Sequence, residues 1–377
     1  MIKIKFFYTI SLLFFILIAL EIISYIFTKN KLFLFNDTPG IYSDFGKEND
    51  LLLGITEKDS WGTWHIPNQS FRHNSSCFDV IMNFNEIGAR DSSFKINLKN
   101  SIILLGDSFA LGFGVNYENT SQYILEKLID RTILNFGAAG NFGPLQELLI
   151  YKEFKNKISH NGLLIYIFPT NDFTDNDRKK WNVIHKDRYR PYFGDKKDPL
   201  NPYYFPEAVP KEAHLDKNRS SIKSYIKYFF WSSNAIRTAI ILLQNDHYLV
   251  GEKHIPKSYY YYKNDQEYNF VLAHKEIAKL AEYRDVLFVI IPAIHDIKKH
   301  NEIDIKDSHK QLNWYVAMNK LVKNSSSKIY MLDLLDYIPN NYEELFHNCD
   351  GHWSNQGNIW AANILSNFIE KNNIFKN

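Results

Sequence analysis

Cysteine is scarce in this chain, and several common ligand-binding motifs are missing. Two cysteines among 377 residues are too few for the disulfide framework of a small secreted domain. Their spacing does not resemble a zinc site either. No GxGxxG, GxxxxGK or HExxH pattern occurs, so the sequence indicates neither a nucleotide cofactor nor a metal. We therefore expect no cofactor. One bridge between Cys77 and Cys349 would form in an oxidising compartment, but we favour two unpaired thiols.

An excess of charge of either sign is lacking as well. The chain has 44 Lys and Arg residues against 42 Asp and Glu residues, which gives a formal net charge of +2. Proteins that bind nucleic acid usually carry a clear excess of basic residues. We therefore expect no nucleic-acid partner. The hydrophobic content of 45% is enough to build a core.

A long apolar stretch lies near the N-terminus. Residues 6–27 hold one charge, Glu21, and about 20 apolar residues are enough to cross a bilayer as a helix. No small-x-small cleavage site follows, which favours an uncleaved anchor over a removed signal peptide. Lys3 and Lys5 precede the stretch, so the positive-inside rule places the short tail in the cytoplasm, although two lysines after the stretch weaken this orientation. We expect a single-pass membrane protein whose folded part is periplasmic or at the cell surface.

We divide the chain into three parts. Residues 1–31 form the cytoplasmic tail and the transmembrane anchor. Residues 32–97 form a lead-in that packs on the folded domain and shows no clear periodicity up to about residue 60. Residues 98–377 form the folded domain, which carries an insert at about 177–265.

Short β-type runs alternate with helical patterns from about residue 100 onward. Apolar strands separated by helices are typical of a parallel sheet that helices cover on both faces. We expect strands at 101–105, 132–134, 163–168, 286–291 and 329–332, and helices near 119–129, 143–157, 267–282, 308–323 and 356–371. The sequence therefore predicts an α/β domain with a parallel sheet.

The insert interrupts this alternation after the third strand. It contains a portion rich in proline and tyrosine at 188–210 and a helical pattern at 221–245. Ligands bind at the carboxyl ends of the strands in open parallel sheets, so the insert would overhang the site as a lid or wall. Simple packing on the scaffold is an equal alternative. Four aromatic residues in or near the insert can stack on sugar rings but more often serve a core, namely Trp181, Tyr189, Tyr192 and Phe193.

The first candidate functional residue is Ser108. The tripeptide Gly106-Asp107-Ser108 comes directly after the apolar strand at 101–105. Glycine permits unusual backbone angles in such a strand-to-helix turn, so a serine hydroxyl can project at the carboxyl edge of the sheet. Capping of the following helix by Asp107 or Ser108 is the ordinary alternative for this tripeptide alone.

A second candidate pair is Asp350 and His352, in a loop ahead of the last predicted helix. A serine hydroxyl becomes a good nucleophile when an imidazole takes its proton, and a carboxylate fixes the tautomer of that imidazole. The two motifs lie after the first strand and after the last strand of the predicted sheet. This placement favours a shared site over an isolated surface histidine.

Two further loops carry groups that stabilise an oxyanion. Residues 135–140 (NFGAAG) follow the second strand, and Thr170-Asn171 follows the third strand. Backbone N–H groups at a glycine turn and an asparagine amide are suitable donors. Both residue types are also common in turns. Four such loops at one edge of a sheet predict one active site.

These four loops resemble the four sequence blocks of the SGNH/GDSL hydrolase family. The resemblance implies that Ser108 is the nucleophile, that His352 is its base and that Asp350 is the orienting acid. It implies an oxyanion hole made by the Ser108 N–H, Gly140 and Asn171. It also implies a flavodoxin-like three-layer α/β/α sandwich, the SGNH hydrolase fold, preceded by one transmembrane helix.

Two blocks depart from the common family pattern. One residue separates Asp350 from His352, which resembles the shorter Asp-x-His-Trp spacing of some polysaccharide-modifying relatives. Pro169-Thr170 replaces the usual glycine before Asn171. Residues 65–91 of the lead-in resemble those of membrane-anchored SGNH proteins associated with polysaccharide assembly.

The resemblance implies a serine esterase that acts through an acyl-enzyme. We expect its substrate to be an ester-linked acyl group, with O-acetyl on an extracytoplasmic glycan as the first choice. The same site would serve an O-acetyltransferase if a sugar hydroxyl intercepted the acyl-enzyme. A third alternative is a non-catalytic glycan-binding or assembly protein that keeps the fold.

Overall fold

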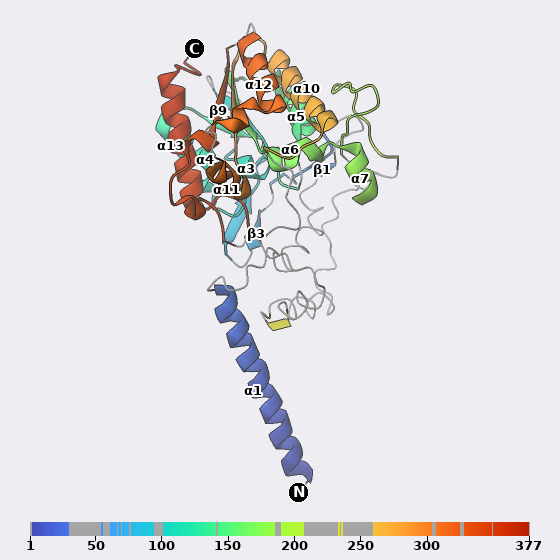
Figure 1. Cartoon of the computed structure of the whole chain (residues 1–377), viewed down its shortest axis with the longest axis vertical. Coiled ribbons are helices and arrows are strands. Elements are labelled where there is room, and N and C mark those ends of the chain that lie inside the picture. The colour runs from blue at the N-terminus through green and yellow to red at the C-terminus, as the bar shows by residue number, and fades with distance from the viewer. Residues whose placement is uncertain are drawn as a thin grey trace.

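The computed structural model shows a folded domain and a separate N-terminal helix (Figure 1). The residues that it describes are 2–29, 54–55, 61–65, 67–68, 70–74, 77–93, 101–140, 142–184, 190–206, 233, 235–236, 259–303, 307–324, 328–348 and 350–376.

Five parallel strands form the central sheet. They are β5 (Ile102–Leu105), β6 (Ile133–Asn135), β7 (Gly162–Ile167), β8 (Asp285–Ile290) and β9 (Ile329–Asp333). The first four of these strands are buried at every position, as expected for a sheet that is covered on both faces. The spatial order β6-β5-β7-β8-β9 is the 2-1-3-4-5 order of flavodoxin-like folds. The predicted α/β fold is therefore confirmed.

Helices form a layer on each face of this sheet (Figure 1). Helix α4 packs against α13 on one side, and α10 packs against α5 and α12 on the other. The helices of the domain are α3 (Ser108–Leu111), α4 (Ser121–Ile129), α5 (Pro144–Phe154), α6 (Pro169–Asp175), α7 (Arg178–Ile184), α10 (Asn264–Ala281), α11 (Ile294–Glu302), α12 (Asn313–Asn324) and α13 (Asn355–Lys371). The short 3-10 helices are η2 (Tyr117–Asn119), η4 (Ser308–Gln311), η5 (Leu334–Tyr337) and η6 (Tyr342–Leu345).

One predicted helix is divided in the structure. The pattern at 308–323 predicts a single helix, but the backbone of Leu312 is extended and separates η4 from α12. The first turn instead takes part in an ion network through His309 and Lys310. The other four helices agree with the prediction to within a few residues at each end.

The strand order places a topological switch point at β5. The chain leaves β5 for β6 on one side and then crosses back to β7 on the other side. In open α/β sheets, such a point leaves a crevice at the carboxyl ends of the strands, and ligands bind there. Ser108 lies three residues beyond the end of β5 and is therefore at the carboxyl end of the sheet, beside this switch point.

The described part of the lead-in forms two small antiparallel hairpins. Strand β1 (Gly54–Ile55) pairs with β2 (Thr63–Trp64), and β3 (Ser70–Asn74) pairs with β4 (Asp79–Asn83). Trp61 and Trp64 are buried in the same core as the central sheet. These hairpins therefore pack on the folded domain.

Helix α1 (Ile2–Lys29) carries the apolar N-terminal stretch. Its residues Phe7–Ile26 are long and apolar enough to cross a membrane, and almost none of them is buried within the protein. The helix projects away from the folded domain (Figure 1). The predicted helix is present, and its orientation across a membrane stays a prediction.

Cys77 is disulfide-bonded. The chain contains one other cysteine, Cys349, which lies outside the described residues. Our preference for two unpaired thiols is therefore wrong for Cys77. Disulfides persist in oxidising compartments, which agrees with an extracytoplasmic domain.

The described part of the insert has its own small aromatic core. Trp181, Tyr192 and Phe205 form a buried cluster, and Phe193 joins the main core. Trp181, Tyr192 and Phe193 therefore serve cores, while Tyr189 lies outside the described residues. The predicted helix at 221–245 also lies outside them, except for residues 233, 235 and 236.

Candidate active site

The turn after β5 presents the Ser108 side chain. Gly106 has a φ of +147°, and a Cβ built there would lie 2.8 Å from the Ala110 Cβ. A larger residue would therefore displace its neighbours. Asp107 Oδ1 accepts a hydrogen bond from the Phe109 N–H at 2.9 Å and caps α3, which begins at Ser108. Asp107 thus supplies the cap, and the half-buried Ser108 hydroxyl is left for another partner.

That partner is His352, which comes from the other end of the domain. Its Nε2 lies 2.7 Å from Ser108 Oγ. On the other side of the ring, Nδ1 is hydrogen-bonded to Asp350 Oδ1, which also accepts the His352 backbone N–H at 2.9 Å. A carboxylate in this position favours the tautomer with a proton on Nδ1, which leaves Nε2 to accept a proton from serine. One residue between Asp350 and His352 is enough for this contact, because the Asp350 side chain folds back toward the backbone of its own loop.

Asp350 also strengthens His352 as a base. Burial opposes the charged imidazole, but the attraction and hydrogen bond of Asp350, assisted by Asp107, outweigh it and raise the pKa of His352 above its ordinary value. Burial likewise opposes the charged Asp350 carboxylate, but His352 outweighs it and lowers the pKa of Asp350. The pair therefore favours transfer of a proton from Ser108 to His352.

Aromatic rings hold the imidazole in place. The centroid of Phe113 lies 4.2 Å from that of His352, and the centroid of Phe109 lies 5.1 Å from it. His73 of β3 lies behind Phe113, with ring centroids 4.5 Å apart. The lead-in hairpin therefore supports the His352 ring indirectly through Phe113. His73 lies in the lead-in segment 65–91, whose resemblance alone does not predict this support.

Asn171 lies beside the nucleophile turn. Its Nδ2 donates a hydrogen bond to Asp107 Oδ2 at 2.9 Å. Pro169 occupies the first position of α6 in place of the usual glycine, and the short helix still brings the Asn171 amide to this position. An amide nitrogen carries two hydrogens, so the bond to Asp107 uses one and leaves the second for an oxyanion. The link between Asp107 and Asn171 was not predicted.

The loop after β6 is joined to the nucleophile turn. A Cβ on Gly137 would lie 2.4 Å from the Leu111 nitrogen, and the Ala138 N–H donates to Gly106 O at 3.2 Å. Gly140 follows with a φ of +83°, which glycine adopts without strain, and it is exposed. Gly140 thus belongs to a loop that contacts the site, and its N–H as an oxyanion donor stays a prediction.

Arg90 braces the same turn from the lead-in. Its guanidinium is buried and donates to the carbonyl oxygens of Leu111 at 2.8 Å, Gly112 at 2.5 Å and Val115 at 2.6 Å. These carbonyls lie at the end of α3 and in the loop that follows it. The fork of donors on arginine suits several acceptors at once, which a lysine would not match.

Asp91 makes a second brace, to β6. Its Oδ2 accepts the Asn135 N–H at 2.9 Å, and its Oδ1 accepts the Tyr117 hydroxyl at 2.8 Å. Burial raises the pKa of Asp91 to about 6, although these hydrogen bonds oppose the rise. Arg90 and Asp91 close the lead-in segment 65–91, and through these contacts they tie that segment to the nucleophile turn and to β6.

Three acidic residues are buried close to the site. Burial, followed by repulsion from Asp107 and Asp175, raises the pKa of Glu147 well above its usual range. The pKa of Asp172 is also raised well above its usual range, by burial and then by repulsion from Glu147 and Asp107. Asp172 Oδ2 accepts the Phe168 N–H at 2.7 Å. Burial and mutual repulsion therefore disfavour the charged forms of Glu147 and Asp172. Asp172 lies in the first turn of α6 and Asp175 is its last residue, and both side chains are buried.

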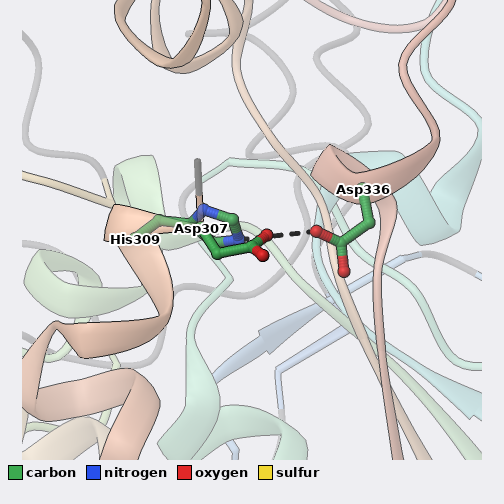
Figure 2. A group of neighbouring side chains, drawn as sticks. All are labelled: Asp307, His309 and Asp336. Carbon is green, nitrogen blue, oxygen red and sulfur yellow. Dashed lines mark ion pairs between the residues drawn. The ribbon is translucent and has the colours of Figure 1, made fainter. Parts of the chain in front are cut away.

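A separate group at the end of β9 has the residue types of a metal site. Ligand atoms of Asp307, His309 and Asp336 all lie within 4.8 Å of one another (Figure 2). Lys310 Nζ, however, lies 3.0 Å from Asp307 Oδ1 and 2.8 Å from Asp336 Oδ2. His309 Nε2 lies 3.2 Å from Asp333 Oδ2. Because Lys310 already supplies positive charge between two of the three ligands, we interpret this group as an ion network.

Comparisons with known proteins give only distant matches, all among solved structures. No family model and no curated protein matches the chain. A solved structure from Desulfitobacterium hafniense DCB-2, described as lipolytic and of the G-D-S-L family, is 10% identical, with 71% of this chain and 99% of that chain covered and a TM-score of 0.31. A carbohydrate esterase family 2 enzyme with a carbohydrate binding domain, from Corynascus thermopiles (Myceliophthora fergusii), is 11% identical, with 72% and 66% covered and a TM-score of 0.37. Likenesses this distant assign neither a family nor a substrate to this chain.

Proposed function

We propose that the chain is a serine esterase of the SGNH type. One observation carries the proposal: Ser108 Oγ lies 2.7 Å from His352 Nε2, while Asp350 is bonded to the opposite nitrogen of the same ring. A serine, an imidazole and a carboxylate in this order form the arrangement that activates a hydroxyl for attack on an acyl carbon. The raised pKa of His352 suits its role as the base.

The reaction proceeds in two halves. His352 takes the proton from Ser108 Oγ as that oxygen bonds to the ester carbonyl carbon. The resulting oxyanion accepts hydrogen bonds from the Ser108 N–H, the Gly140 N–H and the Asn171 amide. As the C–O bond to the alcohol breaks, His352 gives its proton to the leaving oxygen. Water then attacks the acyl-enzyme, His352 accepts a proton from the water, and the proton returns to Ser108 Oγ as the acid leaves.

The substrate class follows from resemblance and location. We propose an ester-linked acyl group, with O-acetyl on an extracytoplasmic glycan as the first choice, because the lead-in at 65–91 and the Asp-x-His spacing resemble polysaccharide-associated relatives. The apolar helix α1 and the disulfide at Cys77 support a membrane-anchored domain outside the cytoplasm. An O-acetyltransferase would use the same residues, with a sugar hydroxyl in place of water.

Fluorophosphonate labelling of the full chain in detergent tests the activated serine. We expect labelling of the parent, and no labelling of Ser108→Ala or His352→Ala. Absence of labelling in a folded parent would favour the non-catalytic glycan-binding alternative. If labelling occurs, a donor ester and a glycan acceptor are supplied together. Acetylated glycan formed faster than free acetate would identify the transferase, and the reverse would identify the esterase.

A further inference from the structure

Glu21 is the one charged residue in the apolar stretch Phe7–Ile26. It lies five residues before the end of that stretch, which corresponds to about 7.5 Å along a helix. A carboxylate at this depth in a bilayer is costly, because no water is there to satisfy its oxygens. Such a residue usually faces a polar partner within the protein.

The insert supplies that partner. Ser233 Oγ donates a hydrogen bond to Glu21 Oε2 at 2.6 Å, and the Ala235 N–H donates to the same oxygen at 3.1 Å. Ser233 Oγ in turn accepts the Ile236 N–H at 3.1 Å, so Ser233 links the Glu21 carboxylate to the backbone at Ile236. The described segment 235–236, drawn in yellow, lies beside α1 (Figure 1).

The contact covers one face of α1. Glu21 and Ser24 are half-buried and lie three residues apart, so they share a face of the helix. The residues between them remain exposed, with Ile22 at 53% and Ile23 at 46%. Glu21 therefore meets the insert, while the apolar side chains of Ile22 and Ile23 are exposed. This is the division expected for a helix that meets protein on one side and lipid on the other.

We propose that the insert makes a second membrane contact, in which Ser233, Ala235 and Ile236 enter the outer leaflet beside α1 and satisfy the Glu21 carboxylate there by hydrogen bonds. The partner of this surface is the lipid bilayer. The chain on both sides of the turn has a suitable composition: residues 228–231 read YFFW, and residues 239–243 read AIILL. The proposal rests on α1 spanning the membrane and is independent of the chemistry at Ser108.

The depth of the turn can be measured with a fluorescent label. Because Cys77 is disulfide-bonded, a single introduced thiol can be labelled under non-reducing conditions with an environment-sensitive maleimide dye. The labelled variants are Ile236→Cys in the turn, Ile22→Cys on the exposed face of α1 and Glu370→Cys on the exposed surface of α13, each in the full chain in vesicles that contain spin-labelled lipid.

We expect the dye at residue 236 to be quenched by the spin-labelled lipid as strongly as the dye at residue 22, while the dye at residue 370 is unaffected. Water-like emission without quenching at residue 236 would overturn the proposal. The signal at residue 22 then identifies the reason: quenching there shows that α1 is inserted and the turn is not, whereas its absence shows that α1 itself lies outside the bilayer.

Cross-linking tests the contact itself. A short bis-maleimide should join the pair Glu21→Cys and Ser233→Cys within one chain in vesicles, as detected by mass spectrometry of the joined peptides. The matched control is Ile22→Cys with Ser233→Cys, because Ile22 is adjacent in sequence but exposed on another face. Equal yields for the two pairs, or no product with the first, would show that the turn does not dock on Glu21.

Discussion

Asp107 Oδ2 accepts a hydrogen bond from Asn171 Nδ2 at 2.9 Å, while its Oδ1 caps the helix that begins at Ser108. One carboxylate therefore fixes two parts of the proposed machinery relative to each other, the nucleophile turn and the amide of the oxyanion hole. Asp107 is buried, so these bonds do not compete with water. Asp107, between Gly106 and Ser108, therefore has a structural role of its own.

Replacement of Asp107 by asparagine should lower kcat. The introduced amide would still cap α3 through its oxygen, but its NH₂ group would face the NH₂ group of Asn171. Loss of a hydrogen bond to a charged group amounts to about 1.5–3 kcal/mol, or roughly 10–100-fold in rate. Turnover of a chromogenic ester by the full chain measures this. Asp195→Asn, at an exposed surface pair, is the control, and an unchanged kcat for Asp107→Asn would refute the orienting role.

Asp350→Asn should shift the pH profile as well as the rate. Hydrolysis requires neutral His352, so activity falls as the pH drops through its raised pKa. Without the carboxylate that pKa decreases, and the acidic limb of kcat/KM moves to lower pH. The maximum rate should fall by a factor on the order of 10²–10⁴, because the tautomer is no longer fixed. A profile of unchanged shape would show that Asp350 does not govern His352.

The same pair predicts a pH dependence of stability. Because the folded pKa of His352 is raised, its contribution is fully present below its unfolded pKa and is lost as the pH rises through the folded pKa. The folded pKa of Asp350 is lowered, so its contribution is present above its unfolded pKa and is lost as the pH falls through the folded one. The free energy of unfolding, measured with urea across these pH ranges, should differ between the parent and Asp350→Asn on both the acidic and the basic side. Parallel curves would show that the pair does not couple to folding.

Arg90→Met should destabilise the fold strongly. It would leave the buried carbonyls of Leu111 and Val115 without the guanidinium donor, at about 1–3 kcal/mol for each group left unsatisfied, while the Gly112 carbonyl keeps the Val115 N–H at 3.4 Å. Arg178→Met is the matched control, because its partner Asp195 is exposed and such pairs contribute about 0–1 kcal/mol. Chemical denaturation gives both values. Similar losses for the two variants would contradict the brace assigned to Arg90.

Replacement of Lys310 should destabilise the ion network at the end of β9, whereas treatment with a metal chelator should not. Burial opposes the charge of Lys310, but Asp336 and Asp307 raise its pKa, so the ammonium stays charged. Lys310→Met would leave these two carboxylates facing each other and should cost about 1 kcal/mol, since the group is partly exposed. Treatment of the parent with EDTA should leave its melting temperature unchanged. A decrease on chelation would indicate a bound metal.

Much of the fold was accessible from sequence because it depends on local pattern. The runs at 101–105 and 163–168 are apolar at successive positions, and buried parallel strands require this. The pairing of Ser108 with His352 was accessible through their places after the first and last strands. By contrast, the contacts of Arg90 and the bond between Asp107 and Asn171 depend on side-chain directions in three dimensions. No spacing along the chain reports those directions.

Burial was also hard to predict for polar residues. Asp172 and Asp175 occur in a polar run, TNDFTDND, which by composition suggests a solvated surface. They are buried because α6 begins directly at the end of β7 and packs against α10. The disulfide at Cys77 was underestimated for a similar reason, since two cysteines far apart in sequence give no local sign of meeting.

Ser108 and its proposed base His352 are separated by 244 residues along the chain, and this separation has a consequence during synthesis. During synthesis, the strand that carries Ser108 emerges long before the loop that carries His352. A nascent or prematurely ended chain that stops before that loop can place the hydroxyl at the edge of the sheet but has nothing to remove its proton. Under the proposed function, reactivity toward esters therefore begins only after the last strand of the sheet and the loop that carries His352 have been synthesised.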